Sequence, residues 1–168
     1  HTMSTSGAFV FQGDTVTLEL FRDQQDTLPW TVQVDASNNL KRTLGNTATK
    51  FNIKRSINPV DGKVLDGLSQ VSLTGPGTTF TSNVIFTVRD QAADRGKTLQ
   101  YAQPYFVTKK QTDQQATKNL YLTVDPDNSD NHTLVWKEDK ASRFVLWPTT
   151  ASVCRVTNQV ANTVGLAP

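Results

Sequence analysis

Two stretches of the sequence place acidic and amide side chains close to aromatic residues. The first, WTVQVDASNN, contains Trp30, Asp35, Asn38 and Asn39. The second, YLTVDPDNSDNHTLVW, contains Tyr121, Asp125, Asp127, Asn128, Asn131 and Trp136. Carboxylates and amides hydrogen-bond the neighbouring hydroxyl groups of a sugar, and an aromatic ring packs against its apolar face. Both stretches are therefore candidate ligand-binding sites, although turn formation selects the same residue types.

Catalytic chemistry has few residues to use in this chain. His1 to Met3 have the character of a cloning remnant, so His132 is the one remaining histidine, and Cys154 is the one cysteine. A Ser/His/Asp or Cys/His arrangement would have to use His132, and no spacing places a nucleophile beside it. The sequence therefore predicts a non-enzymatic protein.

Metal and cofactor signals are incomplete. Asp127, Ser129, Asn131 and Glu138 have the spacing of a calcium-binding loop, but His132 stands where that loop requires glycine. The glycine-containing stretch LTGPGTTF lacks the Lys-Ser/Thr pair of a phosphate-binding loop. We therefore expect neither a metal ion nor a cofactor.

Composition limits the class of protein further. The chain has 168 residues, 36% of them apolar and 19% charged, with a formal net charge of +2. This charge is too small and too dispersed to predict nucleic-acid binding. No run of about eighteen apolar residues predicts a membrane span. The N-terminus lacks a signal-peptide pattern, and the compartment stays open, with an extracellular or cell-surface role among the alternatives.

The length fits one domain. We expect a single β domain over residues 8–156, after a remnant and flexible N-terminus over residues 1–7 and before a tail over residues 157–168.

Short segments rich in Val, Thr, Phe, Ile and Tyr recur between turn-forming residues, which predicts an all-β protein of eleven or twelve strands. The expected strands lie at residues 8–11, 15–21, 30–34, 50–55, 70–74, 83–88, 105–110, 120–124, 132–136, 143–147 and 152–156. The longest helix candidate, TDQQATKNL at residues 112–120, has no apolar stripe and is expected to be a loop.

The sequence also contains an internal repeat. Two copies about ninety residues apart match Thr31 with Thr123, Val32 with Val124, Asp35 with Asp127, Ser37 with Ser129, Asn39 with Asn131, Leu40 with Leu134, Ala48 with Ala141 and Phe51 with Phe144. A shorter middle copy places Phe86 with the two phenylalanines, and GKVLDGLSQVSLTG at residue 62 matches GKTLQYAQPYFVTK at residue 96. Three units of about four strands follow from these matches.

This repeat resembles the β-trefoil superfamily, which includes ricin-B-like and fascin-like binding modules. The carriers are GDTVTLEL, WTVQV, NNLKR and TKFNI in the first unit, and LYLTV, HTLVW and SRFVL in the last. The resemblance covers residues 8–150 and implies a β-trefoil of three pseudo-repeats. It departs from ricin-type lectins because the Q-x-W signature is absent. An antiparallel β-sandwich is the alternative architecture.

In the trefoil interpretation, the core would contain Val32, Leu40, Phe51, Phe86, Val124, Leu134 and Phe144, and function would lie in the turns. The first hypothesis is a lectin-like module that binds a glycan or glycoconjugate through the Asp/Asn-rich loops. The alternative is a protein-binding module, such as a protease inhibitor, a toxin or a surface-attachment subunit. It would act through residues 109–118, which interrupt the repeat.

Overall fold

The computed structural model describes residues 8–21, 29–37, 39–45, 48–75, 78–88, 97–129 and 132–149. These ranges contain ten strands and no helix, which confirms the all-β prediction. The strands are β1 (Thr15–Leu20), β2 (Trp30–Val34), β3 (Leu40–Leu44), β4 (Phe51–Arg55), β5 (Val71–Gly75), β6 (Thr78–Thr87), β7 (Pro104–Thr112), β8 (Thr117–Val124), β9 (Leu134–Lys137) and β10 (Arg143–Pro148). No helix within these ranges has the length and apolar character needed to cross a membrane.

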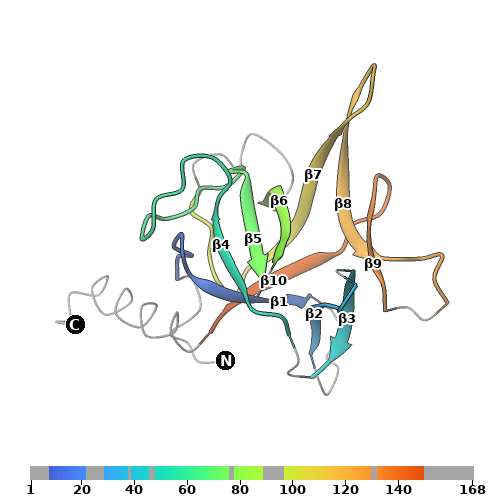
Figure 1. Ribbon diagram of the computed structural model, residues 1–168, viewed down its shortest axis with the longest axis horizontal. Helices are drawn as coiled ribbons and strands as arrows, with labels where there is room; N and C mark the ends of the chain where they lie inside the picture. The colour runs from blue at the N-terminus through green and yellow to red at the C-terminus, as the bar shows by residue number, and fades with distance from the viewer. Residues whose placement is uncertain are drawn as a thin grey trace.

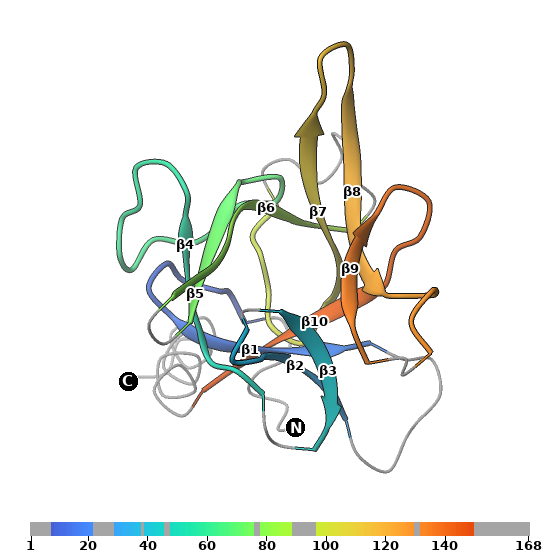
Figure 2. The same cartoon turned by 45° about the vertical axis from the view of Figure 1, so that its right-hand side comes forward.

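Six strands close into a cylinder. Each pairs with the next in the order β1, β4, β5, β6, β7 and β10, and β10 pairs back to β1. All of these pairings are antiparallel. The hairpin β2–β3 and the strands β8 and β9 extend from this cylinder, as Figure 2 shows. The described strands thus form one closed sheet, not the two stacked sheets of a sandwich.

The pairing register of the cylinder repeats three times. One set of partners is Val16 with Phe51, Val71 with Val84, and Tyr105 with Phe144. The other set is Ile53 with Leu73, Phe86 with Val107, and Leu146 with Leu18. All of these side chains are at most 7% exposed. Because side chains alternate along a strand, this shared register points every one of them into the cylinder.

One end of the cylinder is closed by a cycle of backbone hydrogen bonds. The N–H of Val10 donates to the carbonyl of Leu99, that of Leu99 to Leu65, and that of Leu65 to Val10. The three side chains are at most 3% exposed. Each segment then turns through a residue of positive φ, which is Gly13, Leu68 or Ala102. Three distant segments therefore make one apolar plug.

The middle unit is the short one. The first unit contributes β1 to β4 and the last contributes β7 to β10, whereas the middle unit contributes β5 and β6 alone. β5 and β6 pair directly with each other, and the described residues contain no second hairpin inserted between them. The expected strand at residues 8–11 forms isolated bridges at Phe9 and Phe11, and the expected strand at residues 152–156, with Cys154, lies outside the described residues. Ten strands therefore stand where the sequence predicted eleven or twelve.

Equivalent hydrogen bonds in the first and last hairpins shift some of the predicted repeat matches by two residues. Thr49 N–H donates to the carbonyl of Val32, and Ser142 N–H donates likewise to Leu122, so Leu122, and not Val124, corresponds to Val32. The predicted matches of Thr31, Asp35 and Asn39 are consequently shifted by two residues. The matches of Leu40, Ala48 and Phe51 with the last unit agree with the structure, as does that between the segments at residues 62 and 96.

The prediction for Phe86 was wrong by the same two residues. Val84 pairs with Val71 as Phe51 pairs with Val16, whereas Phe86 corresponds to Ile53 and Leu146. Phe86 is nevertheless a core residue at 3% exposure. Val124 is only partly buried, and the remaining predicted core residues are buried: Val32, Leu40, Phe51, Leu134 and Phe144.

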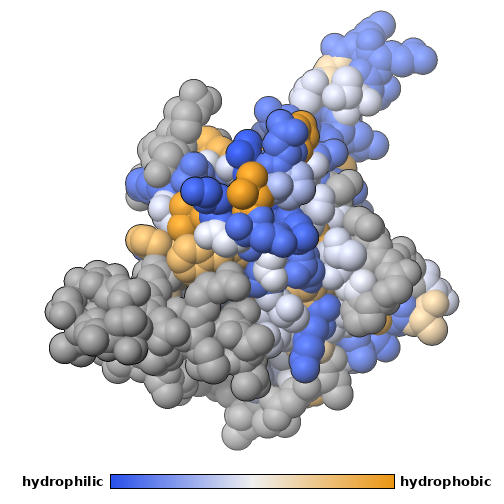
Figure 3. Space-filling view, turned by 60° about the vertical axis from the view of Figure 1, so that its left-hand side comes forward, coloured by the Kyte–Doolittle hydropathy of each residue, from blue (hydrophilic) through white to orange (hydrophobic). Residues whose placement is uncertain are grey.

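Residues 109–118 are not a long loop, and the loop prediction for residues 112–120 was wrong as well. Lys109 to Thr112 pair in register with Leu120 to Thr117, and the turn is closed by the Asp113 N–H donating to the carbonyl of Ala116. Residues 110–119 are all exposed. This β7–β8 ribbon projects far from the body of the protein (Figure 1), and its tip is hydrophilic (Figure 3). Its polar sequence gave no apolar alternation from which to predict strands.

Candidate functional site

Asp35 shapes the turn of the β2–β3 hairpin. Its Oδ1 accepts hydrogen bonds from the backbone N–H groups of Ser37 and Asn39, both at 2.9 Å. The N–H of Asp35 in turn donates to the carbonyl of Asn39. Asp35 is half-buried and Asn39 is exposed, while Asn38 lies outside the described residues. The Oδ1 atom of Asp35 therefore holds the turn.

The β8–β9 hairpin has a corresponding turn held by Asp125. Its Oδ1 accepts a hydrogen bond from the Asp127 N–H at 2.9 Å. The Asn128 side chain donates to the Thr133 hydroxyl at 3.0 Å. The Asp127 carboxylate lies 3.5 Å from the Lys137 ammonium. Asn131, the remaining amide predicted in this turn, lies outside the described residues.

The two hairpins lie side by side but point in opposite directions. Lys41 on β3 forms an antiparallel bridge with Thr133, and the Arg42 N–H donates to the carbonyl of His132 at 2.7 Å. In an antiparallel arrangement, the start of one strand meets the end of the other. The turn of the β8–β9 hairpin therefore lies beside the far end of β3, away from Asp35.

Trp30 lies far from the acidic turn at Asp35, with which the sequence prediction grouped it. Trp30 begins β2 and Asp35 follows its end, so the strand holds them about 16 Å apart along its axis. Trp30 lies instead beside the other hairpin, where its ring centroid is 5.7 Å from that of His132 with a 37° tilt. The structure thus combines a tryptophan of the first unit with the turn of the last.

Arg42 completes this cluster. Its guanidinium carbon lies 4.3 Å from the Trp30 ring centroid, within the range of a cation–π interaction. We call Trp30, Arg42, His132 and Thr133 the seam cluster, because they lie where the two hairpins join. Trp30, Arg42 and Thr133 are half-buried, and His132 is exposed.

The other two predicted aromatic residues do not form a common platform. In the β8–β9 hairpin, Trp136 pairs with Leu122 and Tyr121 pairs with Lys137. Trp136 and Tyr121 therefore lie on opposite faces of this hairpin. The Lys109 ammonium lies 4.4 Å from the Trp136 ring centroid, and burial lowers the pKa of that lysine. The Tyr121 ring packs edge-on against Phe106 at 6.3 Å.

The sequence did not indicate that Arg42 and His132 lie beside Trp30. Arg42 lies outside both acidic stretches, and His132 lies within the second stretch but was weighed there only for catalysis and for a calcium loop. Their proximity to Trp30 depends on how two hairpins about ninety residues apart pack together. The internal repeat was the one sequence feature that related the two hairpins to each other.

No group of three His, Cys, Asp or Glu side chains within the described ranges is placed to hold a metal ion. No protein-family model matches the chain, and no curated protein matches it.

Proposed function

We propose that this chain is a non-enzymatic recognition module of β-trefoil type that binds carbohydrate at the seam cluster. The threefold register of the cylinder, to which each unit contributes two strands, supports the β-trefoil assignment. The observation that carries the binding proposal is the contact between Trp30 and His132, because it brings an aromatic residue beside an Asp/Asn turn.

The chemistry of the seam cluster suits a polyhydroxylated ring. Indole and imidazole rings offer apolar surface to the C–H face of a sugar, while a guanidinium donates hydrogen bonds to its hydroxyl oxygens. The Asn128 side chain donates to the hydroxyl of Thr133 and so places an amide next to the residue that follows His132. Shallow sites of this kind bind single sugars weakly and gain strength when several sites engage together.

A glycan-array screen of the labelled protein tests this proposal. We expect selective binding that is lost in His132→Ala and reduced in Asn128→Ala. Asp35→Ala is the matched control, because Asp35 performs the same turn-holding task as Asp125 at the opposite end of the paired hairpins. Circular dichroism must show that every variant is folded. Binding that disappears with Asp35→Ala and survives His132→Ala would contradict the seam site.

The projecting ribbon favours a second candidate function, the recognition of another protein. Residues 109–118 contain three lysines, Lys109, Lys110 and Lys118, and one acidic residue, Asp113, so this segment carries a net positive charge. In the described pairings, neither strand has a second partner beyond Lys109 and Leu120, so the ribbon exposes two backbone edges. Such edges can pair with a strand of a partner protein.

Shortening the ribbon distinguishes the two candidates. Residues 110–119 can be replaced by a two-residue turn without touching buried side chains, since all of them are exposed. If the function is protein recognition, this variant loses its partner in a pull-down assay from host extract and keeps any glycan binding. If the function is carbohydrate binding, the shortened chain keeps glycan binding and His132→Ala loses it.

A further inference from the structure

Three residues occupy the same position in the threefold arrangement of the closed end. The N–H of Gln12 donates to the carbonyl of Lys63, that of Gly67 to Lys97, and that of Tyr101 to Ala8. Each of the three bonds joins one segment of the plug to the next. Gln12, Gly67 and Tyr101 therefore have equivalent backbone hydrogen bonds. Their side chains differ: the first is an amide, the second is absent and the third is a phenol ring.

Two of these side chains fill the junction that they face. Tyr101 is 1% exposed, and its hydroxyl donates to Oδ2 of Asp14 at 2.7 Å. Gln12 is 2% exposed, and its Oε1 accepts hydrogen bonds from the backbone N–H groups of Val60 at 3.0 Å and Arg55 at 3.4 Å. Both side chains thus combine burial with a hydrogen bond at their far end.

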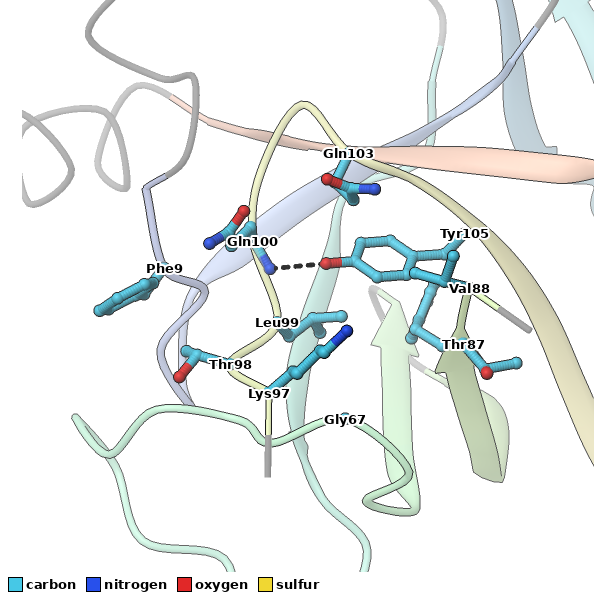
Figure 4. A pocket seen from close by; sticks show the side chains of 11 residues that line it. Phe9, Gly67, Thr87, Val88, Lys97, Thr98, Leu99, Gln100, Gln103 and Tyr105 are labelled. Atoms are coloured by element: carbon cyan, nitrogen blue, oxygen red, sulfur yellow. Dashed lines mark hydrogen bonds between the residues drawn. The ribbon is translucent and has the colours of Figure 1, made fainter. Parts of the chain in front are cut away.

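At the third junction, Gly67 supplies no side chain, and the space remains open. A pocket of about 440 Å³ lies here, with Gly67, Phe86, Lys97, Leu99, Gln103 and Tyr105 among its lining residues. Figure 4 shows Lys97, Leu99, Gln103 and Tyr105 around this space. The pocket falls within the usual size range of small-molecule sites and is about three times as large as a cavity that holds benzene.

The lining predicts what the pocket would hold. Phe86, Leu99 and Tyr105 are buried and provide an apolar floor. Gln103 follows the positive-φ residue Ala102, just as Asp14 follows the positive-φ residue Gly13. Gln103 therefore corresponds to Asp14, whose carboxylate accepts the hydrogen bond from the Tyr101 hydroxyl. Within the described chain, the Gln103 side chain forms no hydrogen bond. Lys97 is exposed and adds a positive charge at the rim.

We propose that this pocket binds a small hydroxylated aromatic acid. Its ring takes the place that the Tyr101 ring fills at the equivalent junction, its hydroxyl group bonds the Gln103 amide, and its carboxylate faces the Lys97 ammonium. This site is separate from the seam cluster and does not depend on carbohydrate binding.

Amide chemical-shift mapping with 4-hydroxyphenylacetate tests the proposal. We expect shifts centred on Thr87, Leu99 and Gln103 that saturate with added probe. Two related probes divide the contributions, because phenylacetate lacks the hydroxyl and 4-hydroxybenzyl alcohol lacks the acid. Lys97→Gln should weaken the acid probes about threefold to fivefold and leave the alcohol unchanged. Lys63→Gln is the matched control, since Lys63 occupies the equivalent position away from the pocket.

Filling the pocket from within is the decisive comparison. Gly67→Tyr introduces the side chain of the equivalent position in the last unit, and Gly67→Gln introduces that of the first. We expect either variant to abolish binding of all three probes while its spectrum remains that of a folded protein. Binding that persists in a folded variant would overturn the proposal, as would the absence of saturable shifts in the parent protein with every probe.

Discussion

The junction at Tyr101 and the junction at Gly67 have the same backbone hydrogen bond and opposite interiors. One is filled by a buried phenol ring that reaches Asp14, and the other leaves a pocket of about 440 Å³. The comparison shows that the threefold backbone pairing does not require identical side chains at equivalent positions. A buried ring fills one junction and a glycine lines the pocket at the other, so the same backbone pairing occurs with both.

The largest expected effect is that of emptying the solid junction. Tyr101→Ala removes a fully buried ring and should lower the free energy of unfolding by about 3–5 kcal/mol. Equilibrium urea denaturation measures this loss. We further expect added p-cresol to restore part of the stability by entering the new cavity. A loss below about 1 kcal/mol would show that Tyr101 is not a structural counterpart of the missing side chain.

A smaller effect should follow from removing only the hydroxyl group. Tyr101→Phe keeps the ring but deprives the buried Asp14 carboxylate of the hydrogen bond from the Tyr101 hydroxyl, while the Phe11 N–H still donates to it at 3.0 Å. We expect a loss of about 1–3 kcal/mol in the free energy of unfolding. Tyr105→Phe provides a comparison, because the Tyr105 hydroxyl accepts a hydrogen bond from the Gln100 N–H.

The first junction should respond more weakly. Gln12→Leu retains the volume of the side chain and leaves the Val60 and Arg55 N–H groups without their shared acceptor. We expect a loss of about 1–2 kcal/mol, measured by thermal unfolding under reversible conditions. If Gln12→Leu is as damaging as Tyr101→Ala, the amide must have a role beyond accepting these two hydrogen bonds.

Gly67→Ala should have the smallest effect. One methyl group cannot fill a pocket of this size, so we expect the free energy of unfolding to change by less than about 1 kcal/mol. Binding of 4-hydroxyphenylacetate should weaken only modestly. An alanine variant that fails to fold would indicate that the backbone at this position differs from the one described at its two equivalents.

Much of the cylinder could be predicted from the sequence because its strands have one buried face. Val16, Leu18 and Leu20 alternate with polar residues, and the structure buries these three and half-exposes their neighbours. The outer half of β8 could not be predicted, because Thr117 to Asn119 are exposed on both faces and follow no apolar pattern. An apolar alternation with a period of two residues arises when one face of a strand is buried. A ribbon that is exposed on both faces has no such alternation.

The candidate site could be predicted only in its parts. The turns around Asp35 and Asp125 were predicted by residue type, and both carboxylates hold their turns as such residues do. The contact between Trp30 and His132 depends on the opposite directions of two hairpins. No local sequence pattern encodes the relative direction of the two hairpins, because it depends on how the cylinder closes.

Closure of the cylinder also determines when this protein can fold during synthesis. One edge of β1 pairs with β10. This edge, which includes Val16, Leu18 and Leu20, stays unpaired until Arg143–Pro148 have been synthesised. Contacts between such distant segments form slowly, because the chain loses entropy before they stabilise it. A nascent chain that stalls before Arg143 exposes an unpaired strand edge, and its most accessible partner is another stalled chain.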